Sequence, residues 1–118
     1  MVELIACLST GKGTWGHVSR LITDGNWTKI ILITNDYGNE NFQKDDKTEL
    51  ICVDLNQGIR ELRDEMEGKL KGKLKSSEVG LNLVSGTGKE HMALLSALLR
   101  LGVGIRLVAL TKDGVEEI

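Results

Sequence analysis

Two uninterrupted apolar runs near the start of the chain constrain its fold most strongly. Residues 4–8 (Leu-Ile-Ala-Cys-Leu) and 29–34 (Lys-Ile-Ile-Leu-Ile-Thr) lack the alternation of a strand that has one face in water. Such runs are typical of strands in a parallel sheet that is covered on both sides. Between them, apolar residues recur at helical spacing over 15–22, and Gly25 follows as a stop signal. The first unit is therefore predicted to be strand, helix, strand.

The same alternation continues along the rest of the chain. Three further apolar segments are expected to be strands: 49–53, 81–84 and 105–110. Two segments with apolar residues at steps of three and four are expected to be helices: 57–75 and 89–101. The polar segment 35–48 is expected to hold only a helical turn, around residues 41–44. This order predicts an α/β fold, a Rossmann-like three-layer sandwich with a mostly parallel sheet of about five strands.

Length, charge and apolar content narrow the class of protein. A chain of 118 residues fits one domain, 1–118, because domains commonly have about 100 to 150 residues. No apolar run approaches the roughly 20 residues that cross a bilayer, and no basic flank precedes the first apolar run, so a cytoplasmic protein without membrane contact is expected. The net charge of −2 argues against binding to duplex nucleic acid, which normally needs a basic excess.

Two glycine-rich turns follow predicted strands and precede predicted helices. The first strand ends in residues 9–14 (Ser-Thr-Gly-Lys-Gly-Thr), and the fourth ends in residues 85–89 (Ser-Gly-Thr-Gly-Lys). In an open parallel sheet, turns at the C-terminal ends of strands line the ligand crevice, and free N–H groups at helix N-termini attract anions. If the first and fourth strands are neighbours, both turns meet where the strand order reverses.

The residue types in both turns suit a phosphate group. Glycine lets the backbone approach a phosphate closely, hydroxyl groups donate hydrogen bonds to its oxygens, and lysine supplies positive charge. We therefore expect a small nucleotide-like ligand to be bound by residues of the two turns: Ser9, Thr10, Gly11, Lys12, Gly13, Thr14, Ser85, Gly86, Thr87, Gly88, Lys89 and His91.

The histidines and cysteines give weaker signals. His17 and His91 each fall in the first turn of a predicted helix, where acid-base work or phosphate contact competes with a role as a polar cap. Cys7 and Cys52 lie in predicted strands, where a free thiol commonly packs as a small hydrophobe. Because no acids or thiols cluster with the histidines, neither a metal site nor a cofactor is expected.

One glycine pattern supports an alternative ligand. Gly11, Gly13 and Gly16 match the G-x-G-x-x-G fingerprint of dinucleotide-binding proteins, and Asp36 follows about 20 residues later, where a ribose-binding acid would be placed. A NAD- or FAD-binding Rossmann subunit is therefore the alternative hypothesis.

The predicted helix 89–101 is apolar around more than half of its circumference. Its apolar residues are Met92, Leu94, Leu95, Leu98, Leu99 and Leu101. A helix that rests on a sheet with its back in water has a narrower apolar face. Two explanations stay open: a homodimer contact, or deep burial in a small domain.

The second glycine-rich turn and its helix also resemble a known family. Residues 84–92 (Val-Ser-Gly-Thr-Gly-Lys-Glu-His-Met) resemble the lysine-bearing strand-to-helix motif of CARF domains, the CRISPR-associated Rossmann-like sensors. Residues 8–11 (Leu-Ser-Thr-Gly) occur where that family keeps its other ligand motif. The order of glycine and threonine in the first of these segments is permuted relative to the family.

The resemblance implies a homodimer that binds cyclic oligoadenylate, a nucleotide second messenger of antiviral defence, across its two-fold axis. It implies contacts from residues of both turns: Ser9, Thr10, Gly86, Thr87, Gly88 and Lys89. Some members of the family cleave the ring without a metal, using a ribose 2′-hydroxyl as nucleophile, and Ser9 and Lys89 would then be the catalytic residues here. Typical members continue into an effector domain, so the resemblance here implies a stand-alone sensor, a sponge or a ring nuclease, or a related domain whose ligand is different.

Overall fold

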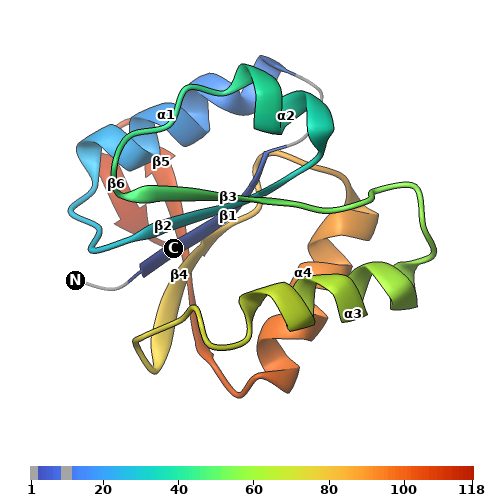
Figure 1. The fold of residues 1–118 in the computed structure, drawn as a ribbon. Coiled ribbons are helices and arrows are strands. Elements are labelled where there is room, and N and C mark those ends of the chain that lie inside the picture. The colour runs from blue at the N-terminus through green and yellow to red at the C-terminus, as the bar shows by residue number, and fades with distance from the viewer. Residues whose placement is uncertain (1–2, 9–11) are drawn as a thin grey trace.

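Helices cover both faces of a central sheet in the computed structural model, which describes residues 3–8 and 12–118 (Figure 1). The strands in this part of the chain are β1 (Glu3–Leu8), β2 (Ile30–Thr34), β3 (Thr48–Cys52), β4 (Glu78–Asn82), β5 (Gly104–Thr111) and β6 (Gly114–Glu117). The helices are the short 3-10 helix η1 (Lys12–Thr14), α1 (Trp15–Asp24), α2 (Asp36–Asn41), α3 (Ile59–Leu70) and α4 (Gly88–Arg100). None of these helices has the length and apolar character needed to cross a bilayer.

The strand order places β1 in the interior of the sheet. The described strands follow the order β3-β2-β1-β4-β5-β6. Neighbouring strands are parallel from β3 to β5, and β6 returns antiparallel to β5. The order reverses between β1 and β4, as in a Rossmann-like sandwich. The predicted α/β class and mostly parallel sheet are confirmed, and β6 adds a strand that the apolar runs did not indicate.

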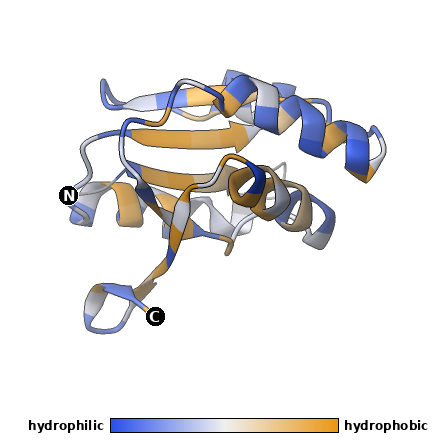
Figure 2. Ribbon diagram, turned by 90° about the horizontal axis from the view of Figure 1, so that it is seen from below, coloured by the Kyte–Doolittle hydropathy of each residue, from blue (hydrophilic) through white to orange (hydrophobic). Residues whose placement is uncertain are grey.

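The uninterrupted apolar run of β1 reflects its cover on both faces. Successive side chains of a strand point to opposite sides. Ile5 and Cys7 pack in the core beneath α3 and α4, whereas Leu4, Ala6 and Leu8 pack in the core beneath α1. Figure 1 shows α1 and α2 on one side of the sheet and α3 and α4 on the other. In Figure 2 the strands are largely hydrophobic, whereas the helices beside them carry both hydrophilic and hydrophobic residues.

The helix predicted over 57–75 is shorter than expected, because α3 ends at Leu70. Gly72 follows with a φ of 83°, a left-handed conformation that terminates the helix. Glu3 of β1 binds the chain that follows this helix: its buried carboxylate accepts a hydrogen bond of 2.7 Å from the Lys75 backbone N–H. The residues that were predicted to form the last turns of the helix are instead bound to β1.

The helical turn predicted around 41–44 is wrong, because the helix forms earlier in the segment. Asn35 directly follows β2 and accepts a hydrogen bond of 3.1 Å from the Gly38 backbone N–H, which caps the start of α2. The chain therefore turns into a helix at the end of the strand. Helix α2 ends at Asn41, where the predicted turn would have begun.

The fourth strand also begins earlier than the predicted segment 81–84, at Glu78. Gly80 interrupts the apolar pattern that indicates a strand. A Cβ at Gly80 would lie 3.0 Å from the ring of Trp27, so glycine leaves room for this buried indole. The missed strand β6 follows a tight turn in which Gly114 has a φ of 109°.

Helix α2 packs closely against the C-terminal ends of β1 and β2. The Thr34 hydroxyl donates a hydrogen bond to the Leu8 carbonyl, which joins the last residues of the two strands. Gly38 lies directly above this pair, and a Cβ there would collide with the Thr34 hydroxyl and lie 3.2 Å from the Leu8 carbonyl oxygen. The absence of a side chain at Gly38 therefore allows α2 to begin immediately after β2.

Replacing Gly38 tests this close approach. Gly38→Ala is expected to lower the free energy of unfolding by about 1–3 kcal/mol, because the added methyl group overpacks the site. Gly68→Ala is the control: a Cβ at Gly68, inside α3, would have no described heavy atom within 4 Å, and alanine is expected to add up to about 1 kcal/mol of stability there. Urea unfolding measures both changes. Similar stability of the two variants would contradict the packing described for Gly38.

Candidate functional site

The C-terminal ends of β1 and β4 lie next to each other, because the two strands are hydrogen-bonded neighbours. The two glycine-rich turns were expected to meet if the first and fourth strands were neighbours, and these strands are neighbours in the sheet. Of the first turn, Ser9, Thr10 and Gly11 lie outside the described residues. The backbone is described again from η1, which leads directly into α1. The second turn, 85–88, is described throughout.

Gly86 brings the second turn onto the end of β1. Its φ of 104° lies in the left-handed region. A Cβ at this position would lie 3.1 Å from Cys7 Cβ and 3.0 Å from His91 Nε2. Cys7 is the penultimate residue of β1. Both the backbone conformation and the close approach favour glycine, as expected for a turn beside a ligand crevice.

The N-terminus of α4 is capped by its own side chains. Thr87 Oγ1 accepts a hydrogen bond of 3.3 Å from the Glu90 N–H, which caps the helix, and donates one of 2.8 Å to Glu90 Oε2. The Glu90 side chain is buried. A phosphate at this end of α4 would therefore meet a carboxylate, and it would have to displace the cap to reach the Thr87 hydroxyl.

His91 and Ser85 are joined across the same turn. His91 Nε2 lies 2.8 Å from the Ser85 carbonyl oxygen, which can only accept, so Nε2 carries a proton. The Ser85 side chain is 1% exposed, and its Oγ has no hydrogen-bond partner among the described residues. A buried hydroxyl without a partner is unfavourable, so a ligand oxygen that entered the turn could bind it without displacing a protein group.

His17 lies apart from His91, on the opposite face of the sheet. Its Nε2 accepts a hydrogen bond of 3.4 Å from the Leu110 N–H and lies 3.3 Å from Asn82 Nδ2. Asn82 in turn donates a hydrogen bond of 2.8 Å to the Val108 carbonyl. His17 thus joins α1 to β4 and β5. The two histidines do not form one acid-base pair.

The N-terminus of α1 lacks the side-chain cap and the acidic residue that are found at the N-terminus of α4. Thr14 is its N-cap residue and makes no side-chain capping hydrogen bond, and the first turn contains no acidic residue. Neither a side-chain cap on Thr14 nor an acid in the first turn therefore offsets the positive end of the helix dipole, which favours an anion. A Cβ at Gly16 would have no described heavy atom within 4 Å, so Gly16 does not provide the close helix–strand approach of the third glycine in a dinucleotide fingerprint.

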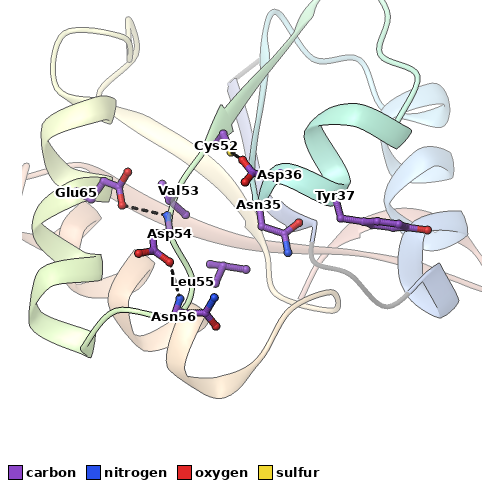
Figure 3. A pocket seen from close by; sticks show the side chains of 9 residues that line it. All are labelled: Asn35, Asp36, Tyr37, Cys52, Val53, Asp54, Leu55, Asn56 and Glu65. Carbon is purple, nitrogen blue, oxygen red and sulfur yellow. Dashed lines mark hydrogen bonds between the residues drawn. The ribbon is translucent and has the colours of Figure 1, made fainter.

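A pocket of about 420 Å³ opens beside the turns, at the C-terminal ends of β2 and β3 (Figure 3). Its lining residues are Asn35, Asp36, Tyr37, Cys52, Val53, Asp54, Leu55, Asn56 and Glu65. In Figure 3, Asp36 and Cys52 lie together on one side, and the chain from Asp54 to Asn56 forms another. Of these residues, the sequence patterns indicate only Asp36 as a ligand contact. The polar residues that directly follow the second and third strands were the available signal for Asn35, Asp54 and Asn56, whereas Glu65 lies within α3 and had no such signal.

Carboxylates give this pocket a negative character. Asp36, Asp54 and Glu65 all line it. Partial burial acts to raise the pKa of Glu65, but hydrogen bonds from Lys69 and from the Asp54 N–H outweigh burial and hold the pKa below its ordinary value. The pocket therefore suits hydroxyl or amine donors rather than a phosphate.

Lys89 connects the second turn with this pocket. It is the second residue of α4, and its Nζ donates a hydrogen bond of 3.1 Å to the carbonyl of Leu55, a lining residue of the pocket. The sequence predicts that Lys89 supplies charge to a phosphate. In this structure its ammonium instead reaches across to the loop between β3 and α3.

The two cysteines are free and differ in access. Cys7 is 1% exposed, and burial together with the nearby Glu90 carboxylate raises the pKa of its thiol. Cys52 is partly exposed, and its thiol donates a hydrogen bond of 3.1 Å to Asp36 Oδ1. Partial burial and this contact with Asp36 raise the pKa of the Cys52 thiol. Core packing is confirmed for Cys7, whereas Cys52 lines the pocket.

Comparisons with known proteins add no relative from which a function could be transferred. No known protein family matches the chain. The search among curated proteins also finds no match. Within residues 3–8 and 12–118, no group of three or more His, Cys, Asp or Glu side chains is arranged to hold a metal ion. The geometry at the C-terminal edge of the sheet is therefore the main guide to function.

The contact between Cys52 and Asp36 predicts a measurable thiol reactivity. In the folded protein at pH 8, iodoacetamide is expected to modify Cys52 slowly and Cys7 not at all, because thiolate is the reactive form. Asp36→Asn removes a negative charge beside Cys52, so the thiol pKa should fall and modification should accelerate several-fold. Mass spectrometry of the intact protein follows the reaction, with Glu116→Gln on β6 as a control that leaves the rate unchanged. An unaltered rate in Asp36→Asn would contradict the described contact.

Proposed function

We propose that this chain is a Rossmann-like nucleotide-binding module. Its phosphate site lies over the ends of β1 and β4, and its nucleoside site is the acidic pocket at the ends of β2 and β3. The observation that carries the proposal is the packing of Gly86 on Cys7, which brings the second glycine-rich turn to the end of β1, the strand that leads to the first turn.

The start of α1 supports the phosphate half of the proposal. Its N-cap, Thr14, leaves the helix without a side-chain cap, and no acid follows in the first turn. In the sequence, Lys12 is two residues ahead of Thr14. Free N–H groups with a nearby lysine are the usual means of holding phosphate at a strand-to-helix turn. The partnerless Ser85 hydroxyl supplies a further donor from the second turn.

The acidic pocket supports the nucleoside half. Its volume of about 420 Å³ falls in the range of roughly 300–1,000 Å³ that is typical of small-molecule sites. The Asp36 and Asp54 carboxylates can accept hydrogen bonds from ribose hydroxyls, and they would repel a phosphate. A ligand with one anionic end and one hydroxyl-bearing end matches both halves of the site, and a nucleotide is such a ligand.

Cyclic oligoadenylate is the specific ligand that we propose. The proposal rests on the resemblance of residues 84–92 to the CARF motif. A cyclic oligoadenylate presents several identical nucleotides around a ring, so it suits a receptor whose two copies each supply one set of turns. It also keeps its ribose 2′-hydroxyls free, which are donors for the acidic pocket.

The outer face of α4 supports the homodimer that such a ligand requires. Met92 and Leu99 are 65% and 64% exposed, and Leu95 is 37% exposed. Deep burial within one chain therefore does not explain the broad apolar face of this helix. An exposed apolar face of this kind is typical of a protein interface, and a two-fold contact would bury it against the same face of a second copy.

Cleavage of the ring is a further part of the proposal. The ribose 2′-oxygen would attack the adjacent phosphorus, the bond from phosphorus to the 5′-oxygen would break, and the leaving 5′-oxygen would take up a proton. The products would be linear, with a 2′,3′-cyclic phosphate at one end and a 5′-hydroxyl at the other. Ser9 and Lys89 are the residues proposed to orient the phosphate and stabilise its developing charge.

A NAD- or FAD-type dinucleotide is the second candidate ligand. The observation that favours it is the position of Asp36, which lines the pocket next to the end of β2. A ribose-binding acid commonly has this position in dinucleotide-binding domains. The open surroundings of Gly16 give this alternative less support than the cyclic nucleotide.

Calorimetry with cyclic tetra-adenylate and cyclic hexa-adenylate tests the binding proposal. The wild-type protein is expected to bind at least one ring, and Lys12→Ala to bind roughly ten- to a hundredfold more weakly, because a lost charge-assisted contact costs about 1.5–3 kcal/mol. Lys71→Ala, at the far end of α3, serves as the matched control. No heat of binding with either ring at high micromolar concentration would contradict the proposal. Chromatography of the same mixtures shows whether linear products form and whether Ser9→Ala slows their formation.

Light scattering tests the homodimer. Leu99→Glu is expected to convert a dimer into a monomer, because it places a charge in the apolar face of α4. Lys44→Glu, on the opposite side of the sheet in the loop after α2, is expected to leave the dimer intact. A wild-type protein that stays monomeric at high micromolar concentration would contradict the proposed contact.

A further inference from the structure

Side chains of two helices, α3 and α4, form hydrogen bonds to the loop between β3 and α3. Glu65 of α3 accepts a hydrogen bond of 3.2 Å from the Asp54 N–H, and its second carboxylate oxygen binds Lys69 at 2.8 Å. From the other side, Lys89 of α4 donates a hydrogen bond of 3.1 Å to the Leu55 carbonyl. The loop is therefore attached to α3 within its own strand–helix unit, where Gln57 Nε2 also donates to Glu65 Oε1, and it is attached to the first turn of α4 through Lys89.

The two attachments control one wall of the acidic pocket. Asp54 and Leu55 both line the pocket, and Figure 3 shows them on the chain that bounds it. Leu55 follows β3, whereas the proposed phosphate site lies over β1 and β4, with β2 between. Lys89 lies in the first turn of α4. When it binds Leu55, its side chain therefore points to the pocket wall and away from the phosphate site.

A phosphate would compete with Leu55 for the Lys89 ammonium. An anionic oxygen accepts a stronger hydrogen bond from a charged donor than a neutral peptide carbonyl does. The Leu55 carbonyl is exposed enough for water to replace the lost lysine contact. The exchange of partners is therefore favourable whenever an anion occupies the phosphate site.

We propose that Lys89 is a positioning residue that links the two halves of the site. Without a bound anion it fixes the pocket wall through Leu55, and with an anion bound it turns to the anion and releases the wall. The release step rests on the proposed nucleotide-binding function, whereas the attachment in the ligand-free protein does not. The pocket thus loosens for the nucleoside when the phosphate is in place.

Hydrogen exchange of the backbone amides at 54–57 tests the attachment in the ligand-free protein. Lys89→Met keeps the length of the side chain and removes its donor, so it is expected to raise the exchange rate about three- to tenfold, as for loss of one partly exposed hydrogen bond. Lys89→Arg is expected to restore slow exchange. Lys71→Met, at the opposite end of α3, is the control and should exchange like the wild type. Equal exchange in Lys89→Met and the wild type would overturn the proposal.

Inorganic phosphate then tests the release step. It carries no nucleoside, so it can occupy the phosphate site and leave the pocket empty. Phosphate is expected to raise the exchange rate at 54–57 in the wild type to the level of Lys89→Met, and to have no effect in Lys89→Met. Line broadening of the phosphorus NMR signal reports binding separately. Bound phosphate without faster exchange would overturn the release step and leave the proposed function standing. Absence of phosphate binding would instead overturn the phosphate site of the proposed function, and the release step with it.

Discussion

The pairing of β1 with β4 is the interaction on which the rest of the structure depends. After β1 the chain builds β2 and β3 on one side of that strand, and β4 then returns to its other side. This return brings together two strand ends that are separated by most of the chain. It also sends α1 and α4 to opposite faces of the sheet, so that their N-termini approach the same edge from two directions. Both cores, and the adjacent C-terminal ends of β1 and β4, follow from this one neighbour relation.

The residues that follow each strand give the C-terminal edge of the sheet a different electrostatic character after β1 than after β2 and β3. After β1, the N–H groups at the start of α1 have no side-chain cap, and no acid compensates them in its first turn. After β2 and β3, three carboxylates surround a pocket. Glu90 marks the boundary, because its buried carboxylate accepts a hydrogen bond from the Thr87 cap at the place where a phosphate would otherwise bind most simply. A ligand that fits this edge must therefore carry its negative charge toward the α1 side.

The sequence predicted the sheet better than the connections. Strands β1 and β2 could be located because both of their faces are buried, which removes polar residues from consecutive positions. Strand β4 was placed too late, because Gly80 interrupts its apolar run to accommodate Trp27. The end of α3 and the start of α2 have local signals in Gly72 and Asn35, but the contacts that support both positions, to Glu3 and to the end of β1, join distant segments that single-segment patterns do not contain. In the same way, both glycine-rich turns were visible in the sequence, but the pocket was not. It arises only when the parallel register of β2 and β3 brings Asp36 next to Cys52.

Helix α4 connects every part of the proposed site. Its inner face packs into the core through Ala93, Leu94, Ala97 and Leu98. Its first turn holds Gly86 against β1 through Glu90 and His91, and reaches the pocket wall through Lys89. Its outer face carries the exposed apolar residues Met92, Leu95 and Leu99. A helix of this length behaves as a rod of about 20 Å, so a change at its first turn also moves the outer face. If two copies pair through α4, occupation of one glycine-rich turn would therefore alter the contact between them, and through that contact the turn of the other copy.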